Sequence, residues 1–391
     1  MQLRMRIGVD VRPLSRPRAG ISRVVFNTIL ELQRIDQQNT YFLYCDREFE
    51  LPFHSERWRK RIHSRFRFLP GTLWLQTEGK SMILRDKLDV FWGTAHVLPL
   101  GLPSEIARVV TIHDLVWRFY PATMGAFSRC MHRVFVERSI QQANKVISVS
   151  ESTARDLQRI LNVPEAKIEV IHHGVGPAYK PHDPSAAAEY VASKYGVSKD
   201  YVLTVGTVEP RKNLVTLVEA MKILRDRGEH SLQLLVVGGT GWKNAKIYKS
   251  VQHSGLTESD IRFLGFVPEE DLPVLYLGAC IFLFPSLYEG FGLPLVEAMA
   301  CGVPVVASNT SSIPEVVQDA ALLVSPNRPE DFAEAMLRVR GDADLRRTMI
   351  QGGLRRACYF RWDEAARRIL KCLERVVARQ RVAEGVTPTS K

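Results

Sequence analysis

The stretch PSLYEGFGLPLVEAMACGVPVVA, from Pro285 to Ala307, decides the fold of this 391-residue chain. It follows an apolar run ending at Phe284, which is typical of a buried parallel strand. Gly290 and Gly292 then let backbone N–H groups approach a ligand, and Pro294 suits the first position of a short helix. The pattern predicts a strand, a loop and a helix whose N-terminus attracts an anion such as a diphosphate.

Two carboxylates accompany this predicted anion site. Glu289 lies in the loop, and Glu297 follows about one turn into the helix. Carboxylates suit such a place when they accept hydrogen bonds from hydroxyl groups, which a sugar ring or a ribose supplies. Taken alone, Glu297 could instead complement the helix dipole and Glu289 could be a solvated loop residue. The two together favour a sugar-nucleotide site made by Glu289, Gly290, Phe291, Gly292 and Glu297.

Outward from this stretch, short apolar runs alternate with longer amphipathic stretches, which predicts parallel βα units. Strands are expected at residues 6–10, 41–45, 65–69, 90–92, 108–112, 145–149, 168–171, 201–205, 232–237, 261–264, 280–284, 303–307 and 321–324. A Gly- and Pro-rich segment at residues 172–184 separates two such sets and predicts a linker. We therefore expect an α/β protein of two doubly wound domains, residues 1–180 and 181–391, facing a central cleft.

Two further segments point to the same chemistry. GTVEPRKNL, from Gly206 to Leu214, follows the first strand of the second half, and TIHDL, from Thr111 to Leu115, ends a strand of the first half. Together with the two glutamates, which have seven residues between them, these segments resemble the family 4 retaining glycosyltransferases over essentially the whole chain. The resemblance is strongest to bacterial mannosyl- and rhamnosyltransferases of O-antigen or exopolysaccharide assembly. It implies the GT-B fold, with two Rossmann-like domains.

The resemblance also implies roles for single residues. Arg211 and Lys212 would neutralise the donor diphosphate and stabilise the leaving nucleotide, although they could be an ordinary basic helix N-terminus. His113 would touch the transferred sugar, whereas alone it is equally well a satisfied polar residue. Asp114 would orient His113 or act on the acceptor, or else cap a helix. Gly20 would contact the donor phosphate or the acceptor.

The loop that carries Gly20 departs from the family pattern because it holds fewer glycines than usual. Arg18 and Arg23 are positioned to compensate. Asp342 and Asp344 formally match a metal-binding DxD, but they lie between two helical stretches, so helix capping is the better interpretation. We expect no cofactor and no catalytic metal, the nucleotide sugar being a substrate.

The net charge is 53 − 42 = +11, and it belongs to the first half of the chain. Residues 1–180 carry 27 Lys and Arg against 17 Asp and Glu, a surplus of 27 − 17 = +10. Residues 57–68 interleave cations with Trp and Phe, as on anionic lipid headgroups, although a solvated basic face fits equally well. Nucleic acid is not expected, because no helix-turn-helix, zinc-finger or RNP-like pattern accompanies the charge.

The remaining features suit a cytoplasmic protein. The six cysteines show no CxxC or metal-ligand spacing, and charge interrupts the N-terminus before an apolar signal region can form. The longest uncharged runs fall short of the roughly 20 residues that span a bilayer. We therefore expect a cytoplasmic enzyme that is peripheral on the inner face of the cytoplasmic membrane.

The function expected from the sequence is metal-independent transfer of a hexose, of the mannose or rhamnose type, from a nucleotide sugar to a lipid-linked glycan with retention. The first domain would hold the acceptor and the second the nucleotide, with its base near residues 238–239 and 266–267. The last helix, residues 362–380, would cross back to the first domain. The alternative is a non-catalytic nucleotide-binding regulatory protein on the same fold. An NAD-dependent oxidoreductase is disfavoured, because residues 11–22 hold no GxGxxG.

Overall fold

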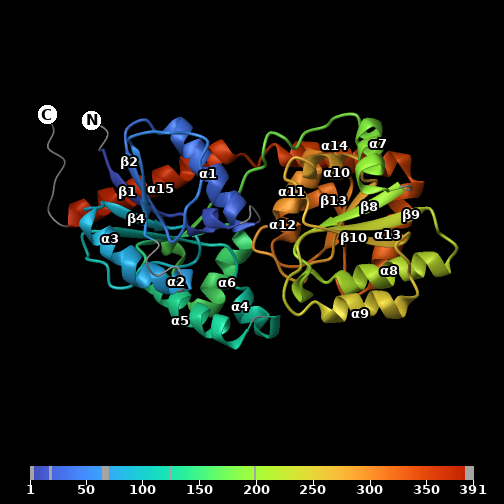
Figure 1. Cartoon of the computed structure of the whole chain (residues 1–391), viewed down its shortest axis with the longest axis horizontal. Coiled ribbons are helices and arrows are strands. Elements are labelled where there is room, and N and C mark those ends of the chain that lie inside the picture. Colours follow the sequence, from blue (N-terminus) through green and yellow to red (C-terminus); the bar gives the residue numbers. More distant parts are fainter. Residues whose placement is uncertain (1–3, 17–19, 64–69, 124, 198–199, 384–391) are drawn as a thin grey trace. The chain divides into compact units, whose positions relative to one another are not determined.

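The structure is a computed structural model, and it describes residues 4–16, 20–63, 70–123, 125–197 and 200–383. The chain folds into two compact units (Figure 1). The first unit comprises residues 1–115, 126–174 and 362–391, and the second comprises residues 116–125 and 175–361. The chain therefore passes between the units at Gly174, and the last helix returns to the first unit.

The first unit is built on a seven-stranded parallel sheet with the order β3-β2-β1-β4-β5-β6-β7. Its strands are β1 (Arg6–Asp10), β2 (Thr40–Cys45), β3 (Trp58–Ile62), β4 (Val90–Gly93), β5 (Ala107–Ile112), β6 (Lys145–Ser148) and β7 (Ile168–Val170). Its helices are α1 (Ile21–Ile35), α2 (Gly71–Trp74), α3 (Lys80–Arg85), α5 (Ala126–Gln142), α6 (Glu151–Leu161) and α15 (Trp362–Ala383). α15 packs against α1, so this last helix belongs to the first unit (Figure 1).

The second unit holds a six-stranded parallel sheet with the order β10-β9-β8-β11-β12-β13. Its strands are β8 (Asp200–Val205), β9 (Leu232–Val237), β10 (Ile261–Gly265), β11 (Ile281–Phe284), β12 (Val305–Ser308) and β13 (Ala321–Val324). Its helices are α4 (Val116–Phe119), α7 (Pro184–Tyr195), α8 (Leu214–Asp226), α9 (Ala245–Ser254), α10 (Leu272–Leu277), α11 (Leu293–Ala300), α12 (Ile313–Val317), α13 (Pro329–Gly341) and α14 (Ala343–Ala357).

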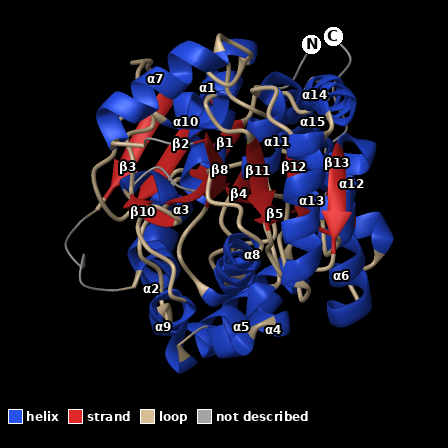
Figure 2. Ribbon diagram, turned by 90° about the vertical axis from the view of Figure 1, so that its right-hand side faces the viewer, coloured by secondary structure: helices blue, strands red, loops and turns tan. Residues whose placement is uncertain are grey.

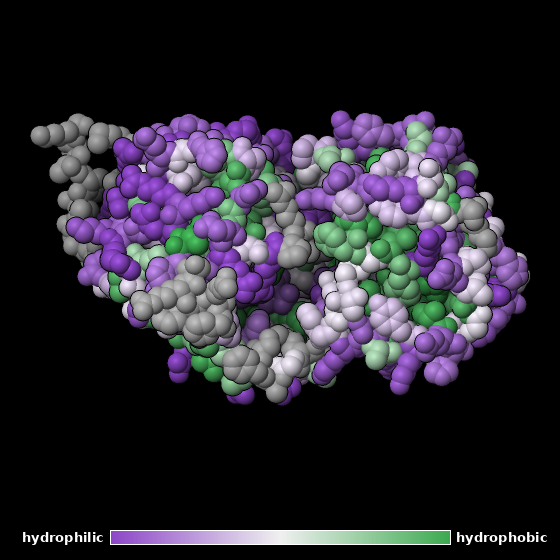
Figure 3. Space-filling view, viewed as in Figure 1, coloured by the Kyte–Doolittle hydropathy of each residue, from purple (hydrophilic) through white to green (hydrophobic). Residues whose placement is uncertain are grey.

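Apart from β3, the strands form close to where the apolar runs predict them. Helices surround the strands in Figure 2. Every residue of β2, β9, β11 and β12 is buried. Hydrophobic residues are not confined to the core, since they also gather on the face of the second unit that Figure 3 shows. The two doubly wound sheets confirm the predicted α/β fold class.

One strand lies where the sequence did not predict it. The sequence predicts a strand at residues 65–69, all of which lie outside the described residues, and a surface segment at residues 57–68. The structure forms the edge strand β3 over Trp58–Ile62, within that segment. Trp58 is buried and stacks on Tyr41 of β2, with ring centroids 3.9 Å apart. This stacking on the sheet fixes the position of the strand, although its neighbours Arg59 and Lys60 are exposed and make the segment look like a surface loop.

Candidate functional site

The loop between β11 and α11 is fixed by the serines that follow β12. The Ser312 hydroxyl donates hydrogen bonds to the carbonyl oxygens of Glu289 and Phe291, both at 3.0 Å. The backbone N–H of Glu289 donates to the Ser311 hydroxyl at 2.8 Å. A loop with its backbone bonded in this way holds the Glu289 side chain in a defined place.

Glu289 lies between two cations. Its carboxylate is 2.9 Å from Arg211 Nη1 and 2.7 Å from Lys212 Nζ. Arg211 and Lys212 belong to the short 3-10 helix η5 (Pro210–Lys212), which follows β8, and β8 neighbours β11 in the sheet. The carboxyl ends of two adjacent parallel strands thus bring these predicted site residues together.

The charges decide the ionisation of Glu289, which is only 7% exposed. Burial alone would raise the pKa of this carboxyl, but the positive charges of Arg211 and Lys212 lower it to about 2. Burial also lowers the pKa of Lys212, and the charge of Glu289 acts against that effect. At neutral pH Glu289 is a carboxylate and can only accept hydrogen bonds.

The cluster contains a fourth charge that sequence reasoning missed. Glu209 is buried, and its Oε1 accepts hydrogen bonds from Arg211 Nη2 at 2.7 Å and Nε at 3.1 Å. Arg211 Nη1 also donates to the carbonyl oxygen of Tyr288 at 2.6 Å. Arg211 is therefore fixed from two sides. The signal in the sequence was a glutamate two positions before an arginine at a strand's carboxyl end.

Lys212 is held less completely than Arg211. Its ammonium donates to Glu289 Oε1 at 2.7 Å and lies 5.1 Å from the centroid of the Phe284 ring. An ammonium has three donors, so this geometry leaves capacity for an anionic ligand. The side chains of Arg211 and Lys212 are each 14% exposed.

The second fingerprint glutamate lies deeper in the unit. Glu297 is 1% exposed within α11, and its Oε2 accepts a hydrogen bond from the buried Tyr276 hydroxyl at 3.0 Å. Phe291 is also buried and packs edge-to-face on Phe360, with ring centroids 5.5 Å apart. The two glutamates therefore have different surroundings, one between cations and one beside a phenol.

The helix start differs slightly from the prediction. α11 begins at Leu293, which places Pro294 at the second helical position and not the first. Gly292 precedes the helix with φ +101°, a conformation that favours glycine. Gly290 lies in the same loop, between Glu289 and Phe291, and is buried. The first turn of α11 thus begins soon after Glu289. In this turn Pro294 has no N–H, and the Leu295 N–H donates to the carbonyl oxygen of Gly292 at 3.0 Å.

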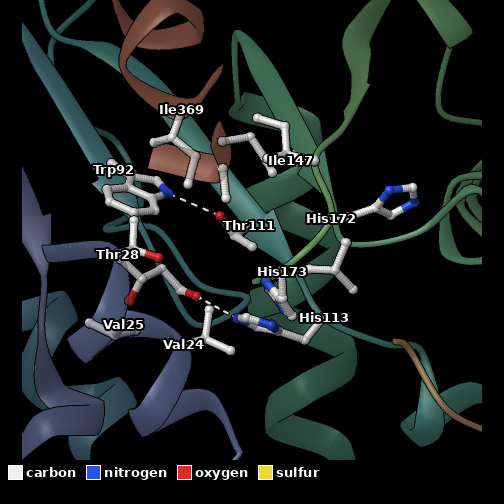
Figure 4. Close-up of a pocket in the computed structure, with 14 residues that line it drawn as sticks. Val24, Val25, Thr28, Trp92, Thr111, His113, Ile147, His172, His173 and Ile369 are labelled. Carbon is white, nitrogen blue, oxygen red and sulfur yellow. Dashed lines mark hydrogen bonds between the residues drawn. The ribbon is translucent and has the colours of Figure 1, made fainter. Parts of the chain in front are cut away.

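His113 lies in the first unit, directly after β5, and lines a small pocket with residues of α1, β4 and α15 (Figure 4). It is buried, and its Nε2 is 2.8 Å from the carbonyl oxygen of Thr94. A carbonyl oxygen can only accept, so Nε2 carries the proton. Burial lowers the pKa of His113 although the hydrogen bond to Thr94 and the charge of Asp114 act against this. A neutral ring with an unprotonated Nδ1 follows.

Other histidine rings pack around His113. His96 lies edge-to-face on it with ring centroids 5.2 Å apart, and His173 lies 5.5 Å away on a tilted plane. Burial lowers the pKa of His173 and lowers that of His96 to about 3. His172 points away from this group in Figure 4. Local sequence patterns do not indicate this cluster, because its members come from separate loops.

Asp114 and Gly20 lie in the first unit as well. Asp114 follows His113 and is half-buried. Gly20 is the exposed N-cap of α1 with φ +48°, and a Cβ placed on it would meet no described atom within 4 Å. Val24, Val25 and Thr28 of the same helix line the pocket of His113. Arg18 lies outside the described residues.

One residue of the DxD-like pair, Asp342, caps a helix, as the sequence predicts. Asp342 is the N-cap of α14, and its carboxylate accepts a hydrogen bond from the Leu345 N–H at 2.9 Å. Asp344 lies 2.8 Å from Arg347 on the helix surface. Both carboxylates therefore interact with residues of α14 itself.

The cations of the basic segment contact the protein itself. Arg57 donates to the carbonyl oxygens of Asp36 and Asn39, and Arg61 pairs with Asp86 at 2.8 Å. Arg65, Phe66, Arg67 and Phe68 lie outside the described residues. Within the described parts of the chain, the helices all fall short of the length and apolarity needed to cross a membrane.

Known proteins share both units of the chain. Residues 18–179 match the family described as Glycosyltransferase Family 4, and residues 193–356 match Glycosyl transferases group 1. O-antigen chain mannosyltransferase B of Escherichia coli is 34% identical over 296 residues, which cover 74% of this chain and 75% of that protein.

Solved structures share the fold. Sucrose-phosphate synthase from Thermosynechococcus elongatus has a TM-score of 0.77 at 22% identity, covering 96% of this chain and all of that one. HepE of Anabaena, solved in complex with UDP-glucose, has a TM-score of 0.74 at 17% identity, covering 95% and 100% of the two chains. At these identities the likeness establishes the arrangement of strands and helices.

Proposed function

Because this chain belongs to glycosyltransferase family 4 and has the GT-B fold, we propose that it transfers a hexose from a nucleotide sugar to a lipid-linked glycan with retention of configuration. The hexose is mannose or a rhamnose-type sugar. The likeness to an O-antigen mannosyltransferase supports this choice, as does a solved structure of the same fold that holds UDP-glucose. The comparisons lend no support to a non-catalytic regulatory protein.

The observation that carries the proposal is the ionised Glu289 held between Arg211 and Lys212 at the end of β11. The chemistry needs cations at the departing diphosphate and an acceptor for sugar hydroxyls, and this cluster offers both. Lys212 is the better diphosphate contact, because Glu209, Tyr288 and Glu289 already engage most of the five donors of Arg211. Arg211 then serves mainly to orient Glu289.

The remaining site residues take roles consistent with their surroundings. Gly290, Phe291 and Gly292 shape the loop, and the start of α11 adds N–H groups for the diphosphate. Glu297 accepts hydrogen bonds from the ribose. In the first unit, neutral His113 contacts the transferred sugar, Asp114 orients it or meets the acceptor, and Gly20 opens the helix that lines the same pocket.

A panel of nucleotide sugars tests the proposal. The purified chain is incubated with GDP-mannose, dTDP-rhamnose, UDP-glucose and related donors, with and without a lipid-linked glycan. Nucleotide release and the glycan product are both measured, and product NMR gives the anomeric configuration. Transfer from one donor with retention supports the proposal. Inversion, or no release from any donor when the acceptor is present, would refute it.

A finer part of the proposal places the first unit on an anionic membrane through residues 57–68. The exposed Arg59 and Lys60 support it, since each cation near such a surface contributes about 1 kcal/mol. The buried Trp58 does not take part. Binding should be stronger to anionic than to neutral liposomes and released by salt. Equal binding to both at low ionic strength would remove this part of the proposal.

A further inference from the structure

A pocket of about 460 Å³ lies in the first unit at the amino ends of β5 and β6, beside the end of α15. Its lining residues are Ser104, Arg108, Asn144, Lys145, Val376, Arg379, Gln380 and Ala383. His113 follows the carboxyl end of β5, five residues after Arg108, which in a strand corresponds to about 16 Å. The pocket is therefore separate from the place where His113 acts.

We propose that this pocket, lined by Arg108, Lys145 and Arg379, binds a phosphate-class oxyanion. Two of the three cations lie on strands and not at a helix end. The dipole of α15 can account for Arg379 near its C-terminus, but it does not explain Arg108 and Lys145. Another reason is needed for these two cations to face one pocket.

The positive charge at the pocket is poorly compensated within the protein. Arg108 Nη1 reaches the carbonyl oxygen of Leu102 at 3.4 Å, and its buried Nε has no partner among the described residues. Lys145 donates to the carbonyl oxygen of Ala166 at 2.8 Å. This hydrogen bond satisfies one donor of the ammonium but does not neutralise its charge. A buried donor without a partner is costly, so an acceptor from outside is favourable here.

The charges of the residues around the pocket also favour a bound anion. Burial and the positive charge of the nearby Arg108 both lower the pKa of Lys167. A bound anion would act against this lowering. A smaller adjoining pocket shares Lys145, Val376 and Arg379. Of the described residues that line the two pockets, Glu169 is the one carboxylate, and it pairs with Arg375. The net charge facing the space is positive.

The chemistry of the lining selects the ligand class. A guanidinium fork and an ammonium are the groups that bind phosphate oxygens. The volume exceeds a single phosphate, and Val376 and Ala383 add apolar surface for an organic remainder. A soluble phosphate ester and a phospholipid headgroup share this chemistry, and the experiment distinguishes them.

Calorimetric titration of the full chain with diphosphate and glycerol 3-phosphate is the first arm of the test. Sedimentation with phosphatidylglycerol or phosphatidylcholine vesicles is the second. Arg379→Gln removes an exposed cation that folding does not need, and it should weaken binding about tenfold or more. Arg108→Gln should do the same, with circular dichroism to confirm folding. Lys371→Gln, which removes an exposed cation of α15 outside the pocket, should leave the affinity unchanged.

Diphosphate can also reach Lys212, so both arms are repeated on Arg211→Gln/Lys212→Gln, in which the pocket is intact. Binding that persists there and falls in Arg379→Gln supports the proposal whatever the fate of the transferase assignment. Binding of the soluble ligands identifies a free phosphate ester, and Arg379-dependent binding to anionic vesicles alone identifies a headgroup. Equal affinities for wild type and Arg379→Gln in both arms, or no binding in either, overturn it.

Discussion

Arg211 Nη1 and Glu289 Oε2 lie 2.9 Å apart, both on side chains that are largely closed to water. The two residues are far apart in sequence and meet because β8 and β11 are neighbours in one parallel sheet. In our proposal, their pairing connects the residues that bind the diphosphate to the loop that binds the sugar. Several measurable properties of the protein depend on it.

The first prediction concerns stability and pH. Glu289 has a folded pKa of about 2, below its ordinary value of 4.5, so its ionised form stabilises the folded state. That contribution is complete above pH 4.5 and is lost as pH falls from 4.5 toward 2. Glu289→Gln removes the carboxylate that pairs with the buried Lys212, while Arg211 keeps Glu209, and should lower the free energy of unfolding by about 3–5 kcal/mol near pH 7.

Urea unfolding of wild type and Glu289→Gln between pH 8 and pH 3 checks this. The difference in free energy of unfolding between the two proteins should stay constant down to about pH 5 and become smaller at lower pH. Asp344→Asn, at an exposed carboxylate, is the control and should show little gap at any pH. A Glu289→Gln gap that widens as the pH falls would contradict the ionisation assigned here.

The second prediction concerns the state of His113. Its lowered pKa and its contact with Thr94 require a neutral ring protonated at Nε2. Nitrogen NMR of labelled imidazoles should show this tautomer from pH 8 down to neutral pH, with His113→Gln used to assign the signal. Because the folded pKa lies below the ordinary 6.5, the contribution of this histidine to stability falls as the pH drops below 6.5. A charged ring at pH 7 would exclude the assignment.

The third prediction concerns the backbone beneath the cation cluster. A Cβ on Gly238 would lie 2.1 Å from the carbonyl oxygen of Gly206, and φ at Gly238 is +144°. Gly238→Ala should therefore lower the free energy of unfolding by about 2 kcal/mol or more and weaken donor binding, since Gly206 leads into the segment that carries Lys212. Gly239→Ala meets nothing within 4 Å and is the matched control. Similar urea midpoints for the two variants would show that the close approach is relieved at little cost.

The sheets and the loop of the site are well predicted by the sequence, because burial on both faces leaves apolar runs that are easy to locate. The position of β3 was missed, since it depends on Trp58 stacking on Tyr41, a contact between separate segments. The sequence also did not indicate that residues 116–125 belong to the second unit, because this depends on Phe119 and Tyr120 packing against Tyr288. The histidine rings around His113 were missed because they come from separate parts of the chain. Glu209 was missed although its partner Arg211 is only two residues away, since the sequence does not show that its side chain turns back to that arginine. Such pairings have no signature in local periodicity.

The fourth prediction concerns metal dependence. In our proposal, Lys212, Arg211 and the start of α11 supply the positive charge that a divalent ion supplies in other transferases. Turnover with the best donor should therefore survive dialysis against EDTA. Lys212→Gln should reduce kcat by about 10²- to 10³-fold, with no rescue by Mg²⁺ or Mn²⁺. If turnover is lost in EDTA and either ion restores it, a divalent metal ion, and not these residues alone, supplies the positive charge at the diphosphate.

The fifth prediction separates the two glutamates of the fingerprint. Glu289 should accept hydrogen bonds from hydroxyls of the transferred sugar, and these contacts change as the ring flattens toward an oxocarbenium-like state. Glu297 lies deeper, beside Tyr276, and should accept from ribose hydroxyls, which the reaction leaves unchanged. Glu289→Gln should then lower kcat and kcat/KM together by about 10²-fold or more, whereas Glu297→Gln should mainly raise the donor KM.

Steady-state kinetics with the donor varied give both constants for both variants, and the Gln substitution keeps the size of each side chain. Because Glu289→Gln also destabilises the protein, the assays run where circular dichroism shows both variants folded. Arg211 offers an internal check, since it orients Glu289 in our proposal. Arg211→Lys should then reproduce part of the kcat loss of Glu289→Gln, and the double variant should lose less than the sum of the two. The reverse pattern for the two glutamates, or two unchanged enzymes, would mean that their roles are assigned wrongly.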